Sequence, residues 1–206
     1  MRYTKVVIMV VASCFLVALP AFADIVTIDF GTGSAGTGGT FTLNSPNATG
    51  TGIPIQTVTI SGALTGDGTY NVAGSCTGSN GSGFGCLNFD TLNNRVQITG
   101  DIPGLSIFTS ELLLKGTFVS WNASVNGLMD ATGPDTKATN LLTALSLPTN
   151  QPFAYFGFSL TTSPISHNSI ISTDFRNTTV PDGGFTLMLL GGVFVSIEAF
   201  RRKLRL

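Results

Sequence analysis

The chain has 206 residues, of which 43% are hydrophobic and only 10% are charged, and its formal net charge is −1. This length suits one domain with a substantial hydrophobic core. Because the bases do not outnumber the acids, the composition excludes nucleic acid as an expected partner.

Residues 1–23 have the layout of a secretory signal peptide. A positively charged start precedes an apolar run over residues 6–20, and Ala21 and Ala23 have the spacing of a signal-peptidase site. The run is shorter than the roughly 20 residues that a membrane-spanning helix needs. We therefore expect cleavage before Asp24 and export of the remainder of the chain.

Residues 24–179 are predicted to form one exported domain that is rich in Gly, Thr, Ser and Asn. The domain contains nine acidic and four basic side chains, so its net charge is about −5. The acids are Asp24, Asp29, Asp67, Asp90, Asp101, Glu111, Asp130, Asp135 and Asp174, and the bases are Arg95, Lys115, Lys137 and Arg176.

Short segments rich in Thr, Val, Ile and Phe predict β-strands through most of this domain. The predicted strands are residues 25–30, 56–60, 95–99, 115–121, 153–160 and 170–175. Residues 153–160 are the most apolar, so we expect a central strand buried on both faces. A short helix is predicted within residues 138–147. Many short strands separated by Gly-rich turns favour a mainly β fold, a β-sandwich or jelly roll.

Two cysteines, Cys76 and Cys86, remain in the domain after the predicted cleavage. In an exported chain this spacing predicts a disulfide that closes a Gly/Ser-rich loop, with a pair of free thiols as the alternative. A metal site is not predicted, because His167 is the only histidine and no further cysteine is available.

Apparent catalytic motifs in the domain lack the context that their chemistry needs. Residues 31–36 match the dinucleotide pattern G-x-G-x-x-G, but a second strand follows in place of a helix, and no acid lies between Asp29 and Asp67. His167 lies in a predicted turn, where a solvated histidine is the expected state. We therefore predict no catalytic residues and no cofactor; calcium binding is left open.

The end of the chain contains a short apolar segment and a basic tail. Residues 185–200 would span about 24 Å as a helix, which is marginal for a hydrocarbon core of about 30 Å. By the positive-inside rule the basic tail, residues 201–206, is expected to stay in the cytoplasm, with the β domain outside. The basic residues of this tail are Arg201, Arg202, Lys203 and Arg205.

The whole segment 180–206 resembles the PEP-CTERM sorting signal of Gram-negative bacteria, most closely its variants that begin Val-Pro-Asp. The resemblance is carried by a polar motif, an apolar helix with Leu189, Leu190 and Gly191, and the basic cluster. The motif consists of Val180, Pro181, Asp182, Gly183 and Gly184. The resemblance implies transient or permanent retention in the inner membrane and processing by an exosortase-type membrane enzyme. It also implies a final location in the envelope or extracellular matrix, where exopolysaccharide is a candidate partner.

The sequence therefore predicts a non-enzymatic, exported surface or matrix protein with a structural or adhesive role. A carbohydrate-binding module is one alternative, and it would need a groove lined by exposed rings such as Trp121, Tyr70 or Tyr155. A secreted hydrolase would need two converging acids, or His167 beside a serine. An uncleaved single-pass membrane protein is the remaining alternative.

Overall fold

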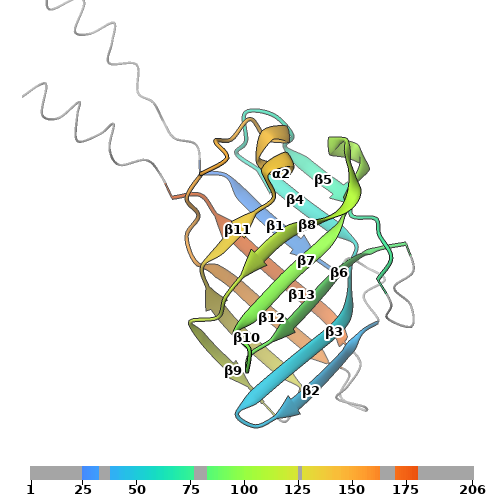
Figure 1. Ribbon diagram of the computed structural model, residues 1–206, viewed down its shortest axis with the longest axis vertical. Helices are drawn as coiled ribbons and strands as arrows, with labels where there is room; N and C mark the ends of the chain where they lie inside the picture. The colour runs from blue at the N-terminus through green and yellow to red at the C-terminus, as the bar shows by residue number, and fades with distance from the viewer. Residues whose placement is uncertain (1–24, 33–37, 77–82, 125–126, 163–169, 181–206) are drawn as a thin grey trace, which may run out of the picture. The chain divides into compact units, whose positions relative to one another are not determined.

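The computed structural model describes residues 25–32, 38–76, 83–124, 127–162 and 170–180 (Figure 1). These residues belong to one compact unit, Ile25–Val180. The predicted signal peptide, the apolar segment 185–200 and the basic tail lie outside the described residues, as does His167.

Seven strands form one antiparallel sheet, in the order β5-β4-β1-β13-β12-β10-β9. Their bounds are β1 Thr27–Gly31, β4 Thr57–Ser61, β5 Gly68–Asn71, β9 Ser120–Ala123, β10 Leu128–Gly133, β12 Phe156–Thr162 and β13 Ile170–Thr178. Six strands form a second antiparallel sheet, in the order β11-β8-β7-β6-β3-β2. Their bounds are β2 Thr40–Asn44, β3 Asn47–Ile55, β6 Gly85–Asp90, β7 Arg95–Ile102, β8 Ile107–Gly116 and β11 Asp135–Lys137.

The two sheets lie in separate layers and enclose one hydrophobic core, as a β-sandwich does (Figure 1). Apolar side chains alternate with polar ones along most strands, so each sheet turns one apolar face inward. Phe89 of β6 and Phe158 of β12 meet across the layers with ring centroids 5.3 Å apart. The prediction of a mainly β, sandwich-like domain is confirmed.

Two details of the strand predictions are wrong. Residues 115–121 are not one strand, because β8 ends at Gly116 and β9 begins at Ser120 in the other sheet. Phe118 is buried between the two strands, where the chain passes from one sheet to the other. Strand β12 is not buried on both faces, since Gly157 and Ser159 are exposed on the outer face of its sheet.

A 3₁₀ turn, η1 (Pro103–Leu105), and a short helix, α2 (Thr139–Ala144), complete the described elements. Helix α2 lies within the predicted range 138–147, and it buries Leu141 and Leu142. Within the described ranges, the structure contains no helix with the length and apolar character needed to cross a bilayer.

Candidate functional site

The two ends of the compact unit are hydrogen-bonded to each other. Strand β1 pairs with β13, and beyond the strands the Val26 N–H donates to Thr179 Oγ1 (2.9 Å) while the Thr179 N–H donates to the Val26 carbonyl (2.8 Å). The Val180 N–H donates to the Pro152 carbonyl at 3.0 Å. The first residue of the predicted sorting motif is therefore fixed to the β domain, although its side chain remains 41% exposed.

The other residues of the predicted processing sites lie outside the described residues. They are Ala21, Ala23 and Asp24 of the signal-peptidase site, Pro181, Asp182, Gly183 and Gly184 of the motif, and Arg201, Arg202, Lys203 and Arg205 of the tail.

Cys76 and Cys86 form a disulfide, as predicted, with their Cα atoms 4.9 Å apart. Cys86 belongs to β6, where its carbonyl accepts a hydrogen bond from the Thr99 hydroxyl of the neighbouring strand β7. The bridge therefore links Cys76, which precedes the loop before β6, to an interior strand of the six-stranded sheet.

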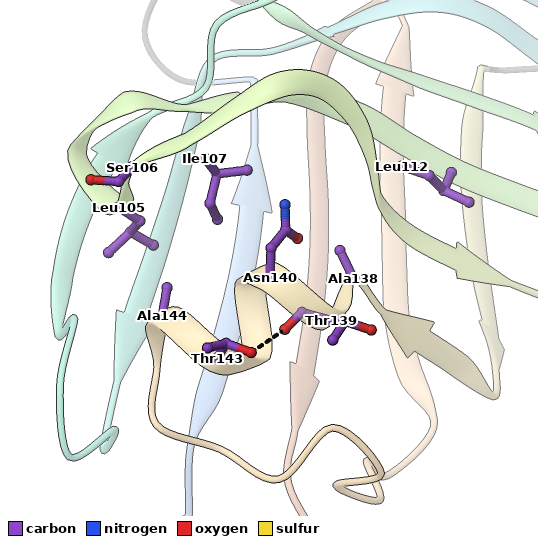
Figure 2. Close-up of a pocket in the computed structure, with 9 residues that line it drawn as sticks. All are labelled: Leu105, Ser106, Ile107, Leu112, Ala138, Thr139, Asn140, Thr143 and Ala144. Carbon is purple, nitrogen blue, oxygen red and sulfur yellow. Dashed lines mark hydrogen bonds between the residues drawn. The ribbon is translucent and has the colours of Figure 1, made fainter.

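A shallow groove of about 810 Å³ lies between the start of β8 and helix α2 (Figure 2). Its apolar part includes Leu105, Ile107 and Leu112, and its polar part includes Thr139 and Thr143. None of its lining residues is aromatic, acidic or a histidine. The groove therefore provides neither a stacking surface for a sugar nor an acid–base pair.

Two of the three aromatic residues named for sugar binding, Trp121 and Tyr70, pack against other parts of the domain. The Trp121 indole N–H donates to the Pro46 carbonyl (3.3 Å), and its ring contacts the edge of Phe118. The Tyr70 ring lies against Gly104, so closely that a Cβ at that position would lie 2.6 Å from it. Of the three rings, only Tyr155 belongs to the exposed residues, at 59%.

On the outer face of the seven-stranded sheet, two acids and one base lie on adjacent strands. Asp29 of β1 is directly opposite Arg176 of β13, and it shares a hydrogen bond with Asp174, two residues away on the same face. Partial burial, the hydrogen bond and repulsion from Asp174 raise the pKa of Asp29 to about 7, against the opposing effect of Arg176. Asp29 therefore keeps its proton to a higher pH than an ordinary aspartate does.

A second polar cluster lies inside the sandwich. Asp135 and Lys137, two residues apart on β11, form an ion pair, and neither side chain has exposed surface. Asn177 reaches them from β13 in the opposite sheet, and its Nδ2 donates to Asp135 Oδ1 while Lys137 Nζ donates to Oδ2. The Phe153 ring covers the amine, with its centroid 4.4 Å from Nζ. We call these four residues the inner cluster.

Burial governs the charges of the inner cluster. Burial raises the pKa of Asp135, and the contacts with Lys137 and Asn177 partly offset this rise. Burial lowers the pKa of Lys137, and the contact with Asp135 partly offsets this fall. Both shifts favour the neutral forms of the two groups, because an ion loses its hydration when it is buried. The cluster therefore combines a carboxyl group, an amine and a carboxamide in a site without water access.

Sequence reasoning missed this cluster, although part of it leaves a trace in the sequence. Asp135 and Lys137 are an i, i+2 pair of opposite charges, which puts both on one face of a strand. Their direction, toward the core, is not visible in the sequence, and nothing there connects them to Asn177. In the described part of the chain, no group of three or more His, Cys, Asp or Glu side chains could hold a metal ion.

Comparison of the chain with protein-family models, with curated proteins and with solved structures found no match.

Proposed function

We propose that the chain is an exported bacterial surface or matrix protein with a structural or adhesive role, which an exosortase-type membrane enzyme sorts through residues 180–206. In this proposal residues 1–23 direct export, and residues 185–200 hold the chain in the inner membrane, at least transiently. The basic tail stops translocation, so that the motif halts at the outer edge of the bilayer.

The observation that carries the proposal is the extent of the folded unit. It runs from Ile25 to Val180, so it begins just after the predicted signal-peptidase site and ends at the first residue of the sorting motif. These bounds lie within one residue of those predicted for the exported domain, residues 24–179. The Cys76–Cys86 disulfide further supports export, because such bonds persist in oxidising compartments.

The protein isolated from its native host provides the first test. We expect its N-terminus to be Asp24 and its intact mass to correspond to cleavage near residues 180–184. Retention of Met1 would contradict export through a cleaved signal peptide. A mature N-terminus together with an intact C-terminus would identify an uncleaved single-pass membrane protein instead.

Two sets of substitutions separate the roles of the motif and the tail. Replacing Pro181 and Asp182 by alanine should leave full-length protein in the inner membrane, because the enzyme no longer recognises the motif. Replacing the four basic residues of the tail by glutamine should instead let the chain pass through the membrane or insert incorrectly. If neither change alters the size or location of the protein, the segment is not a sorting signal.

A further inference from the structure

The inner cluster contains the three groups that are needed to join two side chains through an amide bond. These groups are a primary amine (Lys137), a carboxamide (Asn177) and a carboxyl group that contacts both (Asp135). We propose that Lys137 and Asn177 form an intramolecular isopeptide bond, Nζ to Cγ, and that Asp135 is the catalytic residue.

The geometry places the two reacting groups on one carboxylate. Lys137 Nζ donates a hydrogen bond to Oδ2 of Asp135, and Asn177 Nδ2 donates one to Oδ1. The amine and the carboxamide therefore contact the same carboxyl group, which would transfer protons between them. Holding reactants in this way replaces an encounter by an intramolecular step. Asn177 Oδ1 is buried and has no hydrogen-bond partner among the described residues, so the contact of the carboxamide with Asp135 is through Nδ2, the leaving nitrogen.

The surroundings keep the reacting groups dry and fixed. The Phe153 ring covers Nζ on one side. Gly116, opposite Asp135 on strand β8, leaves little room, since a Cβ there would lie 3.1 Å from the Asp135 Cβ and 3.0 Å from the Phe156 ring. Exclusion of water matters because water would compete with the amine for the activated carboxamide.

The protonation states that the reaction needs are those that burial favours. An amine attacks only through its free electron pair, and a carboxyl group acts as a general acid only when it is protonated. Transfer of one proton from Lys137 to Asp135 produces both states, and it removes two charges from the protein interior. Burial lowers the pKa of Lys137 and raises that of Asp135, which favours this transfer.

The reaction then balances without an oxidant or a co-reactant. The Nζ electron pair attacks Asn177 Cγ, and the carboxyl proton of Asp135 passes to Nδ2, the atom that this carboxyl group contacts. The Cγ–Nδ2 bond breaks, Nδ2 leaves as ammonia, and the proton released from Nζ returns to Asp135. One C–N bond forms, one C–N bond breaks, and the chain loses one molecule of ammonia.

The bond would connect the two sheets at the end of the domain that leads to the sorting signal. Lys137 lies on β11, an edge strand of the six-stranded sheet, and Asn177 lies on β13, an interior strand of the other sheet. Asn177 precedes Val180 by three residues. If the protein is anchored through its C-terminal segment, a use that rests on the proposed function, force on β13 would pass directly to the second sheet.

The test is the mass of the full-length chain, exported by a bacterial host, denatured and reduced. After correction for the observed N- and C-termini, we expect a deficit of about 17 Da, the mass of ammonia, because the amide replaces the carboxamide nitrogen. Proteolysis should release a branched peptide that joins Lys137 to Asn177. A wild-type chain of full mass with only linear peptides would overturn the proposal.

Two other products are distinguished by the same digest. A succinimide at an asparagine also loses ammonia, but it yields a linear peptide. An amide between Lys137 and Asp135 would instead lose water, about 18 Da, and would join two residues of one strand. Either product in place of the Lys137–Asn177 branch would contradict the proposed bond.

Matched variants assign the roles of the three residues. Lys137→Met and Asn177→Ala should each restore the full mass, and Asp135→Asn, which keeps the shape of the side chain but cannot accept a proton, should do the same while both reacting groups remain. Lys115→Met, which removes an exposed lysine of β8, should keep the deficit. Persistence of the branched peptide in Asp135→Asn would show that Asp135 is not the catalyst. The wild-type result decides whether the bond exists, even if a variant fails to fold.

Discussion

Strand β13 contributes to two polar clusters that differ mainly in their access to water. On its inner face, Asn177 joins Asp135 and Lys137 between the sheets. On its outer face, Asp174 and Arg176 lie beside Asp29 of β1. Each cluster contains a carboxyl group whose pKa is raised. The two clusters lie on opposite faces of the sheet, because successive side chains of a strand point to opposite faces.

The comparison shows how burial changes what the same residue types can do. In the inner cluster, the Lys137 amine and the Asn177 amide nitrogen each donate to Asp135, and water cannot replace it. The loss of one residue therefore leaves another buried polar group without a partner. In the outer cluster, water can replace any missing partner, and salt screens the charges. The inner cluster is therefore suited to a single covalent step and the outer one to reversible proton binding.

The largest expected effect comes from breaking the inner cluster. Lys137→Ala should lower the free energy of unfolding by about 3–5 kcal/mol, because it removes both the amine that contacts the buried Asp135 carboxyl and the proposed bond to Asn177. Denaturation by urea at pH 7 measures the effect.

The double variant Asp135→Leu/Lys137→Met is the control for that experiment. It removes both charges and keeps apolar volume, so it should recover part of the stability that Lys137→Ala loses. A double variant no more stable than Lys137→Ala would show that the cluster contributes more than the compensation of a buried charge, as a covalent bond does.

A second prediction concerns the disulfide, which lies in neither cluster. The stability that is lost with it is compared with the stability that is lost with the inner cluster. Replacing Cys76 and Cys86 by serine should destabilise the domain by about 2–3 kcal/mol on the chain-entropy model. The isopeptide deficit in mass should remain unchanged in this variant. Loss of the deficit would show that the disulfide has to position the inner cluster, which no described contact indicates.

Much of the fold was predictable because its signals are local. The alternation in residues 25–30, 56–60, 95–99 and 170–175 corresponds to β1, β4, β7 and β13, since period-two apolar patterns reflect one buried sheet face. The spacing of Cys76 and Cys86, together with the predicted export, favoured the disulfide that the structure contains. Strands such as β2 and β11 were missed because they are short and polar at the sheet edges, where burial leaves little pattern.

The inner cluster could not be predicted, because it depends on which sheet each strand joins. In the sequence Lys137 is one of four bases of the domain, and burial of a lysine is rare unless it is paired. Its pairing with Asn177 requires β11 and β13 to lie in opposite sheets with their inner faces in contact. That arrangement is a property of the topology, which no local spacing encodes.

The third prediction concerns the pH dependence of the outer cluster. The folded state holds the Asp29 proton more tightly than the unfolded state, since its pKa is about 7 against an ordinary value of 3.8. The resulting stabilisation is complete below the ordinary value and is lost as the pH rises through about 7. Because the group is partly exposed, we expect less than about 1 kcal/mol. Asp29→Asn should remove this contribution, which the difference from wild type in urea denaturation at pH 5 and pH 8 measures. An unchanged pH dependence would contradict it.

The smallest effect is expected from Arg176→Gln. Loss of this partly screened charge should change the free energy of unfolding by no more than about 0.5 kcal/mol, because exposed ion pairs contribute little. It should nevertheless raise the pKa of Asp29 further, since Arg176 is the group that favours the ionised carboxylate. Carboxyl chemical shifts in an NMR titration measure this change. Arg95→Gln, on the other sheet, is the matched control and should leave the Asp29 titration unaffected. A large loss of stability in Arg176→Gln would mean that water does not replace the missing partner, and the contrast between the two faces of β13 would not hold.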